Sequence, residues 1–216
     1  MKTLLLLSLL VCSLTFNLRS TKQYYDAYVM AVQWPNGYCS GANCKGKDAN
    51  VPKNIMTIHG LWPGLINGNM LKDCTSGVKI VDDGSSLFQN MRTYWPSFSK
   101  SNVDFWTHEY NKHGYCMVEE YGWSGYKNYF QFVLDLHSRT YRDLFRNAFA
   151  GYSGTTVISY ETLKSKIQSV IPGATINMRC TGGYISELYF YLNKNYSPSP
   201  NTKFSNNCKS GKLVMK

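Results

Sequence analysis

Four stretches of the chain predict β-strands, and three of them alternate apolar and polar positions, which is the pattern of a half-buried strand. Positions 28–34 predict a first strand, and Pro-Asn-Gly at 35–37 is expected to end it as a turn. A short strand at 55–59 is expected to stop at Gly60, and Trp-Pro-Gly at 62–64 breaks the pattern soon afterwards. Two further strands are predicted at 175–179 and 185–192.

Apolar residues spaced as on a helix predict helical segments in five other places. A serine cap at position 85 or 86 begins one that runs to Arg92. Asn102 or Asp104 caps a second, which Gly114 is expected to end. The remaining segments are expected at 126–137, 143–149 and 159–170.

These elements predict an α+β fold, because strands and helices are mixed without the regular β-α-β alternation of a parallel sheet. We expect one domain with a mainly antiparallel sheet and several helices. The 216 residues are enough for one sizeable core. A composition with 44% apolar and 15% aromatic residues excludes a disordered chain.

The N-terminus has the pattern of a secretory signal peptide. Lys2 precedes an apolar run from Leu4 to Leu14, which is shorter than the roughly 20 residues that span a bilayer. We therefore expect a signal peptide over residues 1–20 and a mature domain over 21–216. No later segment predicts a membrane span, so a secreted protein, or one in the lumen of a lysosome or vacuole, is expected.

Cysteine usage agrees with export. One of the seven cysteines, Cys12, lies in the predicted leader, and an even number remains. An even count in an exported chain predicts disulfides, three in this case. Cys39 and Cys44 form a plausible local loop; zinc would need a second close ligand pair, and none follows. Spacing alone leaves the other pairings open.

The balance of charge favours a polyanionic partner. The formal net charge is +10, and losing Lys2 and Arg19 with the leader lowers it by two, to +8. Nucleic acid, an anionic membrane or an acidic glycan would all suit such a balance, although many exported proteins are basic without binding any of them. Asn195 begins the single N-glycosylation sequon, with Pro198 directly after it.

Positions 105–116 concentrate groups with acid–base chemistry. On a helix that turns about 100° per residue, His108, Lys112, Glu109 and His113 lie in that angular order across roughly 140°. Two proton-transfer groups, a cation and an acid would thus share one helix face. Such a face is more typical of a functional site than of a solvated surface.

Four alternative chemistries fit poorly. A zincin helix needs histidines four residues apart, whereas His108 and His113 are five apart. A cysteine nucleophile is disfavoured because Cys116 is expected in a disulfide. No Gly-x-Ser-x-Gly elbow is present, and no complete phosphate-binding Gly-x-x-x-x-Gly-Lys-Ser/Thr loop, because Asp48 follows Gly46 and Lys47 where the motif needs Ser or Thr. The sequence predicts neither a metal nor a cofactor.

Acid–base cleavage of a phosphodiester by its own 2′-hydroxyl fits these residues better. One histidine can accept the hydroxyl proton, another can protonate the leaving oxygen, and a lysine can stabilise the added negative charge. His59, at the end of a predicted strand, is a candidate for a third histidine supplied from elsewhere in the chain, although a histidine there is more often structural. His137 lies on an apolar helical stripe and is interpreted as a core histidine.

Three segments resemble the T2 family of secreted ribonucleases. They are Val-Gln-Trp-Pro at 32–35 followed by Tyr38-Cys39, Met-Thr-Ile-His-Gly-Leu-Trp-Pro at 56–63, and Phe-Trp-Thr-His-Glu-Tyr-Asn-Lys-His-Gly-Tyr-Cys at 105–116. The resemblance is specific from about residue 28 to 116 and looser afterwards. It implies an α+β fold and metal-independent endonucleolytic cleavage of single-stranded RNA through 2′,3′-cyclic phosphates.

The resemblance also implies roles for single residues. His113 would be the general base, His59 the general acid, and His108 would position the phosphate. Glu109 and Lys112 would stabilise the transition state. The family pairing would join Cys74 to Cys116 and Cys180 to Cys208, which leaves Cys39 for Cys44. A monomer is expected.

Base recognition is less defined by the sequence. Gln33, Trp62 and Phe105 are candidates for holding a base, because aromatic stacking suits unpaired RNA; a core role is an equal alternative. Tyr110 and Tyr115 depart from the usual family pattern without touching the acid–base groups. An alternative function is an idle binding protein on the same scaffold, for RNA or a cell surface. Such a protein would have no reason to keep all five acid–base residues.

Overall fold

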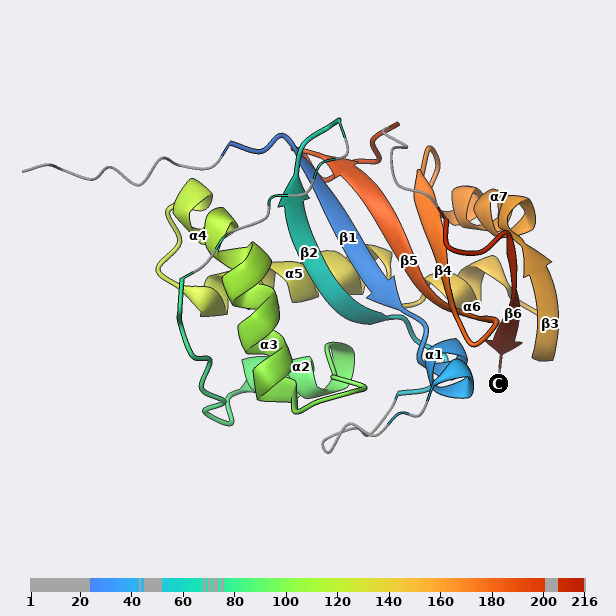
Figure 1. Cartoon of the computed structure of the whole chain (residues 1–216), viewed down its shortest axis with the longest axis horizontal. Helices are drawn as coiled ribbons and strands as arrows, with labels where there is room; N and C mark the ends of the chain where they lie inside the picture. The colour runs from blue at the N-terminus through green and yellow to red at the C-terminus, as the bar shows by residue number, and fades with distance from the viewer. Residues whose placement is uncertain are drawn as a thin grey trace, which may run out of the picture.

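The computed structural model describes residues 24–42, 44, 52–67, 69, 71, 74, 76–200 and 206–215. The predicted signal peptide at 1–20 lies outside these residues. The chain builds one mixed α and β domain around a six-stranded sheet (Figure 1). The predicted α+β class is therefore confirmed.

The sheet has the order β2-β1-β5-β6-β3, and β4 pairs with β5 outside this path. Every pairing is antiparallel except that of β5 with β6, so the prediction of a mainly antiparallel sheet is also confirmed. The strands are β1 (Ala27–Gln33), β2 (Thr57–Gly64), β3 (Gly154–Ser159), β4 (Ile176–Thr181), β5 (Tyr184–Asn193) and β6 (Ser210–Met215).

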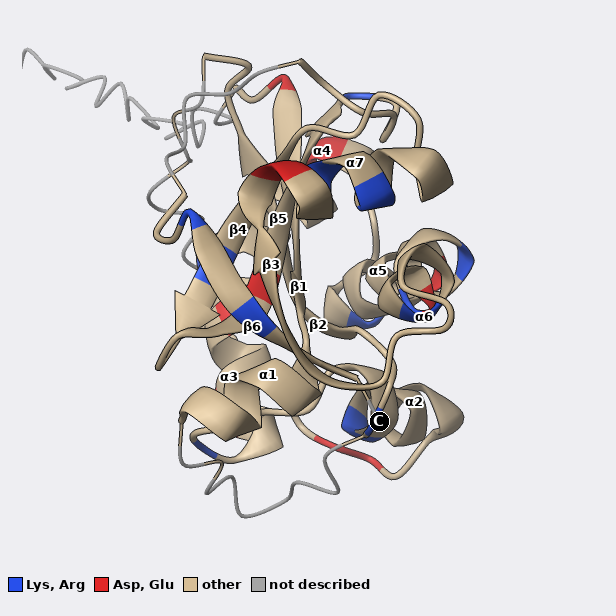
Figure 2. Ribbon diagram, turned by 90° about the vertical axis from the view of Figure 1, so that its right-hand side faces the viewer, with Lys and Arg blue, Asp and Glu red and all other residues tan. Residues whose placement is uncertain are grey.

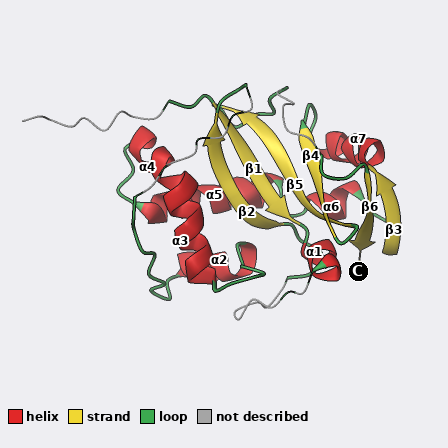
Figure 3. Ribbon diagram, in the orientation of Figure 1, coloured by secondary structure: helices red, strands yellow, loops and turns green. Residues whose placement is uncertain are grey.

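Helices α5 and α6 cover one face of this sheet, and α2, α3 and α4 lie beyond its β2 edge (Figure 3). None of the helices among the described residues is long and apolar enough to cross a bilayer. The helices are α1 (Pro35–Gly41), α2 (Ser86–Tyr94), α3 (Asn102–Glu109), the π-helical turn η1 (Tyr110–Gly114), α4 (Tyr115–Tyr121), α5 (Tyr126–Thr140), α6 (Leu144–Ala148) and α7 (Tyr160–Val170).

The hydrophobic core lies between the sheet and α5. Every residue of β1 is buried, because this strand has a neighbour on each side. On α5, Tyr129, Phe130 and Val133 are fully buried, as their helical spacing predicted. His137 lies on the same stripe, and its Nε2–H donates to the carbonyl oxygen of Met56 at 2.9 Å. Its interpretation as a core histidine is confirmed.

Two predicted element boundaries near β1 and β2 are wrong. Residues 35–37 begin helix α1 instead of forming a turn, because Pro35 occupies the first helical position, where its fixed φ suits a helix. Strand β2 does not stop at Gly60 but pairs with β1 as far as Gly64. Pro63 is tolerated within it because β2 is an edge strand, which need not donate every backbone N–H to a neighbour.

The helix predicted to end at Gly114 continues instead. Its cap is Ser101, whose Oγ accepts from the backbone N–H of Asp104 at 3.2 Å, and not Asn102 or Asp104. The helix continues through η1 into α4. It ends at Gly122, whose backbone has the left-handed conformation. A Cβ at Gly114 would lie 2.7 Å from the Tyr129 ring, so this glycine permits close packing.

Other predicted elements keep their places with small shifts, and two strands were missed. Ser85 and Ser159 precede α2 and α7 as predicted, although the Ser85 side chain makes no capping bond. Strands β3 and β6 were not predicted; they pair with each other at the far edge of the sheet. On that side of the molecule, Lys and Arg are spread over several elements instead of forming one block (Figure 2).

Three disulfides join the cysteines as the family pairing implied. Cys39 binds Cys44, Cys74 binds Cys116, and Cys180 binds Cys208, with Cα–Cα distances of 5.2, 5.2 and 6.0 Å. The Cys74–Cys116 bond ties the segment after β2 to the first turn of α4. It therefore links the chain that follows the strand of His59 to the end of the helical segment that carries His108 and His113.

Candidate active site

A β-bulge brings His59 to the site. Ala31 pairs with Gly60 and Val32 pairs with Ile58, so His59 is the extra residue of β2 at this point. The bulge lets Ile58 stay in the core while His59 turns to the open face, a common use of bulges near active sites. The Trp95 indole N–H donates to the His59 carbonyl oxygen at 2.8 Å and fixes the bulge.

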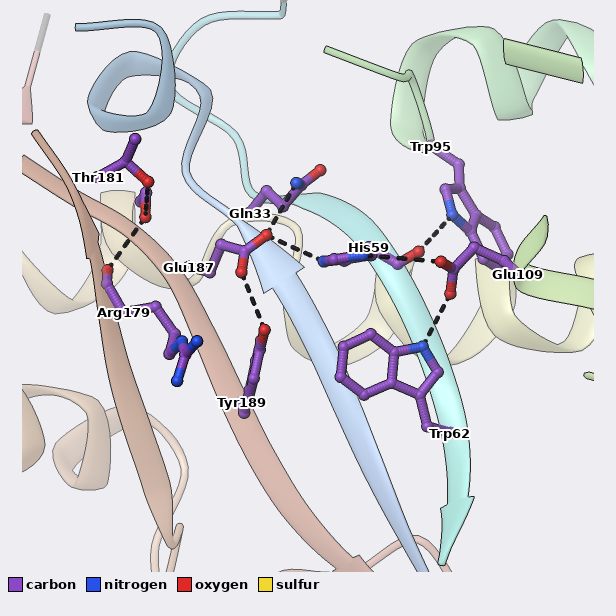
Figure 4. A network of polar contacts seen from close by, with 10 residues as sticks. Gln33, His59, Trp62, Trp95, Glu109, Arg179, Thr181, Glu187 and Tyr189 are labelled. Atoms are coloured by element: carbon purple, nitrogen blue, oxygen red, sulfur yellow. Dashed lines mark hydrogen bonds and ion pairs between the residues drawn. The ribbon is translucent and has the colours of Figure 1, made fainter. Parts of the chain in front are cut away.

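The imidazole of His59 lies between two carboxylates (Figure 4). Its Nδ1 donates to Glu187 Oε1 at 2.9 Å, and its Nε2 lies 3.6 Å from Glu109 Oε1. The other carboxyl oxygen of Glu109, Oε2, accepts a hydrogen bond from Trp62 Nε1–H at 2.8 Å, which fixes the orientation of the group. Strand and helix segments from three parts of the sequence thus meet at one imidazole.

Glu187 is a site residue that sequence reasoning missed. It lies on β5, two strands from His59, with β1 between them. Its carboxylate also accepts from Gln33 Nε2 at 2.9 Å and from the Tyr189 hydroxyl at 3.1 Å. The alternation of 185–192 predicted the strand, but only the strand order reveals that Glu187 faces the site.

The π-helical turn η1 shapes the other side of the site. The backbone N–H of Tyr115 bonds to the carbonyl oxygen of Tyr110, five residues back, so the turn is wider than an α-turn. The predicted angular arc of 140° assumed an α-helix throughout and is wrong here. His113 stacks at a tilt on Trp62, with ring centroids 5.2 Å apart.

Two adjoining cavities contain the predicted catalytic residues, and three residues, His59, His108 and Glu109, line both. The larger has a volume of about 510 Å³ and is lined by His59, Trp62, Leu71, His108, Glu109, Lys112 and His113. The smaller, of about 220 Å³, is lined by Gln33, Tyr38, His59, Ser97, Phe98, Ser99, Lys100, Phe105, His108, Glu109 and Glu187. All five predicted catalytic residues therefore line one cavity.

The environments of His59 and His113 push their pKa values in opposite directions. Burial alone lowers the pKa of His59, but the hydrogen bond to Glu187 and the charge of Glu109 outweigh it and raise the pKa above its usual value. Burial lowers the pKa of His113 to about 3, and the nearby Lys112 and His108 add to this effect. The surroundings therefore favour the charged form of His59 and the neutral form of His113.

Burial and neighbouring charges also shift the pKa values of Glu109, His108 and Glu187. Burial raises the pKa of Glu109 despite the opposing charge of His59, which favours its protonated form. Burial and the cations Lys100 and Lys112 lower the pKa of His108. Glu187 differs: although burial opposes it, the hydrogen bond from His59 lowers the pKa of Glu187 and keeps it charged.

The candidate base-binding residues lie around these cavities. Gln33 and Phe105 line the smaller cavity, and Trp62 lines the larger. Gln33 and Phe105 are also buried, with 6% and 8% of their surface exposed. Each therefore both lines the site and packs against the core. Among the described residues, no three His, Cys, Asp or Glu side chains are grouped as metal ligands would be.

Comparison with known proteins gives one consistent family. A family model described as the ribonuclease T2 family matches residues 25–208. Ribonuclease Rh of Rhizopus niveus is 33% identical over 191 residues, which cover 78% of this chain and 73% of that protein. Ribonuclease DdI of Dictyostelium discoideum is 32% identical over 117 residues, and the match spans about half of each chain, 51%.

Solved structures show the same fold. The RNase-related protein from Calystegia sepium superposes with a TM-score of 0.71 over 89% of this chain and 98% of that chain, at 20% identity. RNase NT, solved in complex with 5′-AMP, superposes with a TM-score of 0.63 over 89% of this chain and 98% of that chain, at 26% identity.

Proposed function

The chain belongs to the ribonuclease T2 family and is an endoribonuclease, and from this premise we propose how it acts. It cleaves single-stranded RNA by attack of a 2′-hydroxyl on the neighbouring phosphodiester, which yields a 2′,3′-cyclic phosphate. His113 is the general base and His59 is the general acid. The reaction needs no metal ion.

The observation that carries this assignment is the contrast between the surroundings of the two histidines, with carboxylates beside His59 and a buried ring next to Lys112 at His113. A base must be neutral to accept a proton, and burial favours neutral His113. An acid must hold a proton to donate it, and the two carboxylates favour charged His59. Both rings line the same cavity of about 510 Å³, which has room for the reacting phosphate and ribose.

Each proton transfer has a donor and an acceptor. His113 takes the proton from the 2′-hydroxyl as its oxygen forms the bond to phosphorus. His59 gives a proton to the 5′-oxygen as that phosphorus–oxygen bond breaks. The negative phosphate itself raises the pKa of the neighbouring His113 when bound, which makes this ring a stronger base than in the free protein.

The other three residues stabilise the added negative charge. Lys112 lies in the cavity as a cation for the phosphorane oxygens. Glu109 lines the same cavity, and its Oε1 lies 3.6 Å from His59 Nε2, so it stabilises the transition state through the charged His59 ring. His108 lines both cavities and positions the phosphate between them.

Base recognition and compartment complete the proposal. Gln33 and Phe105 in the smaller cavity and Trp62 in the larger would hold unpaired bases, with the aromatic rings stacking on them. The three disulfides fit an extracellular or vacuolar protein. We therefore propose that residues 1–20 are a signal peptide, that 21–216 form the exported domain, and that it acts as a monomer.

The test uses the exported domain with mixed-sequence RNA in EDTA at pH about 5, below the ordinary pKa of histidine. Fragments with 2′,3′-cyclic phosphate ends are expected. Matched DNA and 2′-O-methyl RNA, which lack the attacking hydroxyl, should stay intact. Cleavage of either control, or loss of RNA cleavage in EDTA, would contradict the mechanism. RNA binding without cleavage would favour an idle binding protein.

A further inference from the structure

Glu187 is the most completely hydrogen-bonded charged group of the site. Its Oε1 accepts from His59 Nδ1 and from Gln33 Nε2, both at 2.9 Å, and its Oε2 accepts from the Tyr189 hydroxyl at 3.1 Å. The residue is only 9% exposed. A buried carboxylate is costly unless such donors surround it, so the fold holds this group in one place and one orientation.

We propose that Glu187 is a positioning residue of the reaction, which orients the His59 ring through Nδ1 and keeps that ring charged until it donates its other proton. The inference rests on the proposed role of His59 as the acid. A histidine ring has two nitrogens, and fixing a hydrogen bond at one determines what the other presents. With Nδ1 bound to Glu187, Nε2 is directed to the Glu109 side, where the cavities lie.

The proton balance shows why the hydrogen bond must stay. When Nε2 protonates the leaving 5′-oxygen, His59 becomes neutral but keeps the Nδ1 proton that bonds to Glu187. In the later hydrolysis of the cyclic phosphate, the roles reverse: Nε2 accepts a proton from water, and His113 returns one to the 2′-oxygen. The Glu187 contact persists in both steps, so the ring presents the same nitrogen each time.

Glu109 is less suited to this task. Its oxygen lies 3.6 Å from Nε2, the nitrogen that must face the substrate, and Trp62 holds its other oxygen. Burial also raises the pKa of Glu109, whereas the pKa of Glu187 is lowered, because the hydrogen bond and charge of His59 and the hydrogen bonds from Gln33 and Tyr189 together outweigh burial. Glu187 is therefore the lasting anion beside the acid.

Other charges act on His59 from the surrounding elements. Lys100, in the segment before α3, lowers the pKa of His59. His108 on α3 and His113 on η1 each have pKa values that the charge of His59 lowers. Arg179 on β4 pairs in register with Glu187 and lies over the Tyr189 ring, 5.4 Å from its centroid. Lys100 and Arg179 are cations, and the carboxylate of Glu187 opposes their effect on His59.

The decisive variant is Glu187→Gln, which keeps the shape and a hydrogen-bond acceptor but removes the charge. NMR titration should show the His59 pKa falling by about 1 or more, the usual effect of losing an adjacent opposite charge. At pH 7, kcat should fall about 10-fold or more while KM stays within about twofold; at pH 4.5, kcat should be close to wild type, because His59 is charged in both proteins.

A matched control is Tyr189→Phe, which removes one hydrogen bond from the same carboxylate and leaves its charge. It should shift the His59 pKa much less than Glu187→Gln. An unchanged His59 pKa in Glu187→Gln, or an equal loss of kcat at both pH values, would overturn the inference. The NMR titration needs no turnover, so a shifted His59 pKa in a protein that makes no cyclic phosphate would support the contact and reject the proposed function.

Discussion

The strand side and the helix side of the site treat histidine in opposite ways. On the strand side, His59 sits on a β-bulge between the carboxylates of Glu187 and Glu109, and its pKa is raised. On the helix side, His113 lies in a π-turn beside Lys112 and His108, and burial lowers its pKa to about 3. The pKa of one residue type is thus shifted in opposite directions within a single cavity.

The contrast arises from which element supplies the neighbours. Strand β5 brings a carboxylate to one ring, whereas the helix carries its own cations beside the other. Both elements also depart locally from regular geometry, by a bulge and by a π-turn, and each departure occurs at a histidine. A regular strand and a regular α-helix would have placed these side chains elsewhere. The bulge and the π-turn therefore direct the two histidines into the site.

The largest expected effect is loss of either histidine. His59→Ala and His113→Ala should each lower kcat/KM by about 10²–10⁴, the usual contribution of a general acid or base. A pH profile from about 3 to 8 distinguishes their roles. Activity should fall at low pH as His113 gains a proton and at high pH as His59 loses one, so each variant should lose one limb. Retention of wild-type rates by both variants would reject the assignment.

The next largest effect concerns the cation of the helix side. Lys112→Gln should lower kcat by about 100-fold, because a group aimed at developing charge contributes mainly in the transition state. Lys112→Arg should retain more of the rate. As a control, Lys127→Gln removes a lysine whose partner, Asp83, lies away from the cavities, and should leave kcat unchanged. A similar loss in both Gln variants would mean that net charge, not position, matters.

Much of the helix side could be predicted from the sequence, because its residues are close together in the chain. His108, Glu109, Lys112 and His113 were recognised from one short segment, and all four line the larger cavity. What the segment did not reveal is the π-turn, which depends on how the helix packs around Tyr129 and Gly114. The residues were predictable, but their angular relationship was not.

The strand side was predicted less completely. His59 was found from its motif, yet Glu187 is 128 positions away and meets it only because the sheet has the order β2-β1-β5. Local alternation predicts that a strand exists but not which strand lies beside it. Strand β3 was missed because it is mostly exposed, so it lacks a clear apolar face.

A smaller effect is expected at Gly60, where the strand side and the helix side of the site are in contact. A Cβ at Gly60 would lie 2.3 Å from both Glu109 Oε2 and Trp62 Nε1, so Gly60→Ala should force this hydrogen-bonded pair apart. We expect about 10-fold lower kcat/KM, with a loss of stability of about 1–3 kcal/mol, as is typical of overpacking. Thermal unfolding and kinetics measure the two effects. Wild-type stability together with wild-type kcat/KM would show that Glu109 and Trp62 can move to accommodate the methyl group without affecting the site.

The smallest effect on catalysis is expected at His137, a buried histidine outside the site that tests whether burial alone can hold a ring neutral. Burial lowers its pKa to about 4, against about 6.5 when unfolded. Since the unfolded chain binds the proton more readily, the stabilisation is full above pH 6.5 and is lost as pH falls towards 4. The full difference is about 3 kcal/mol.

The measurement is denaturant unfolding at several pH values for wild type and His137→Gln. Gln cannot titrate but can donate a hydrogen bond to the Met56 carbonyl oxygen, so the variant should lose less stability between pH 6.5 and 4 than wild type, with little change in kcat. The two proteins are compared by the slope of the unfolding free energy against pH, so a loss of stability that is equal at every pH does not affect the test. Identical slopes would mean that His137 titrates normally, and that burial alone does not explain the low pKa of His113.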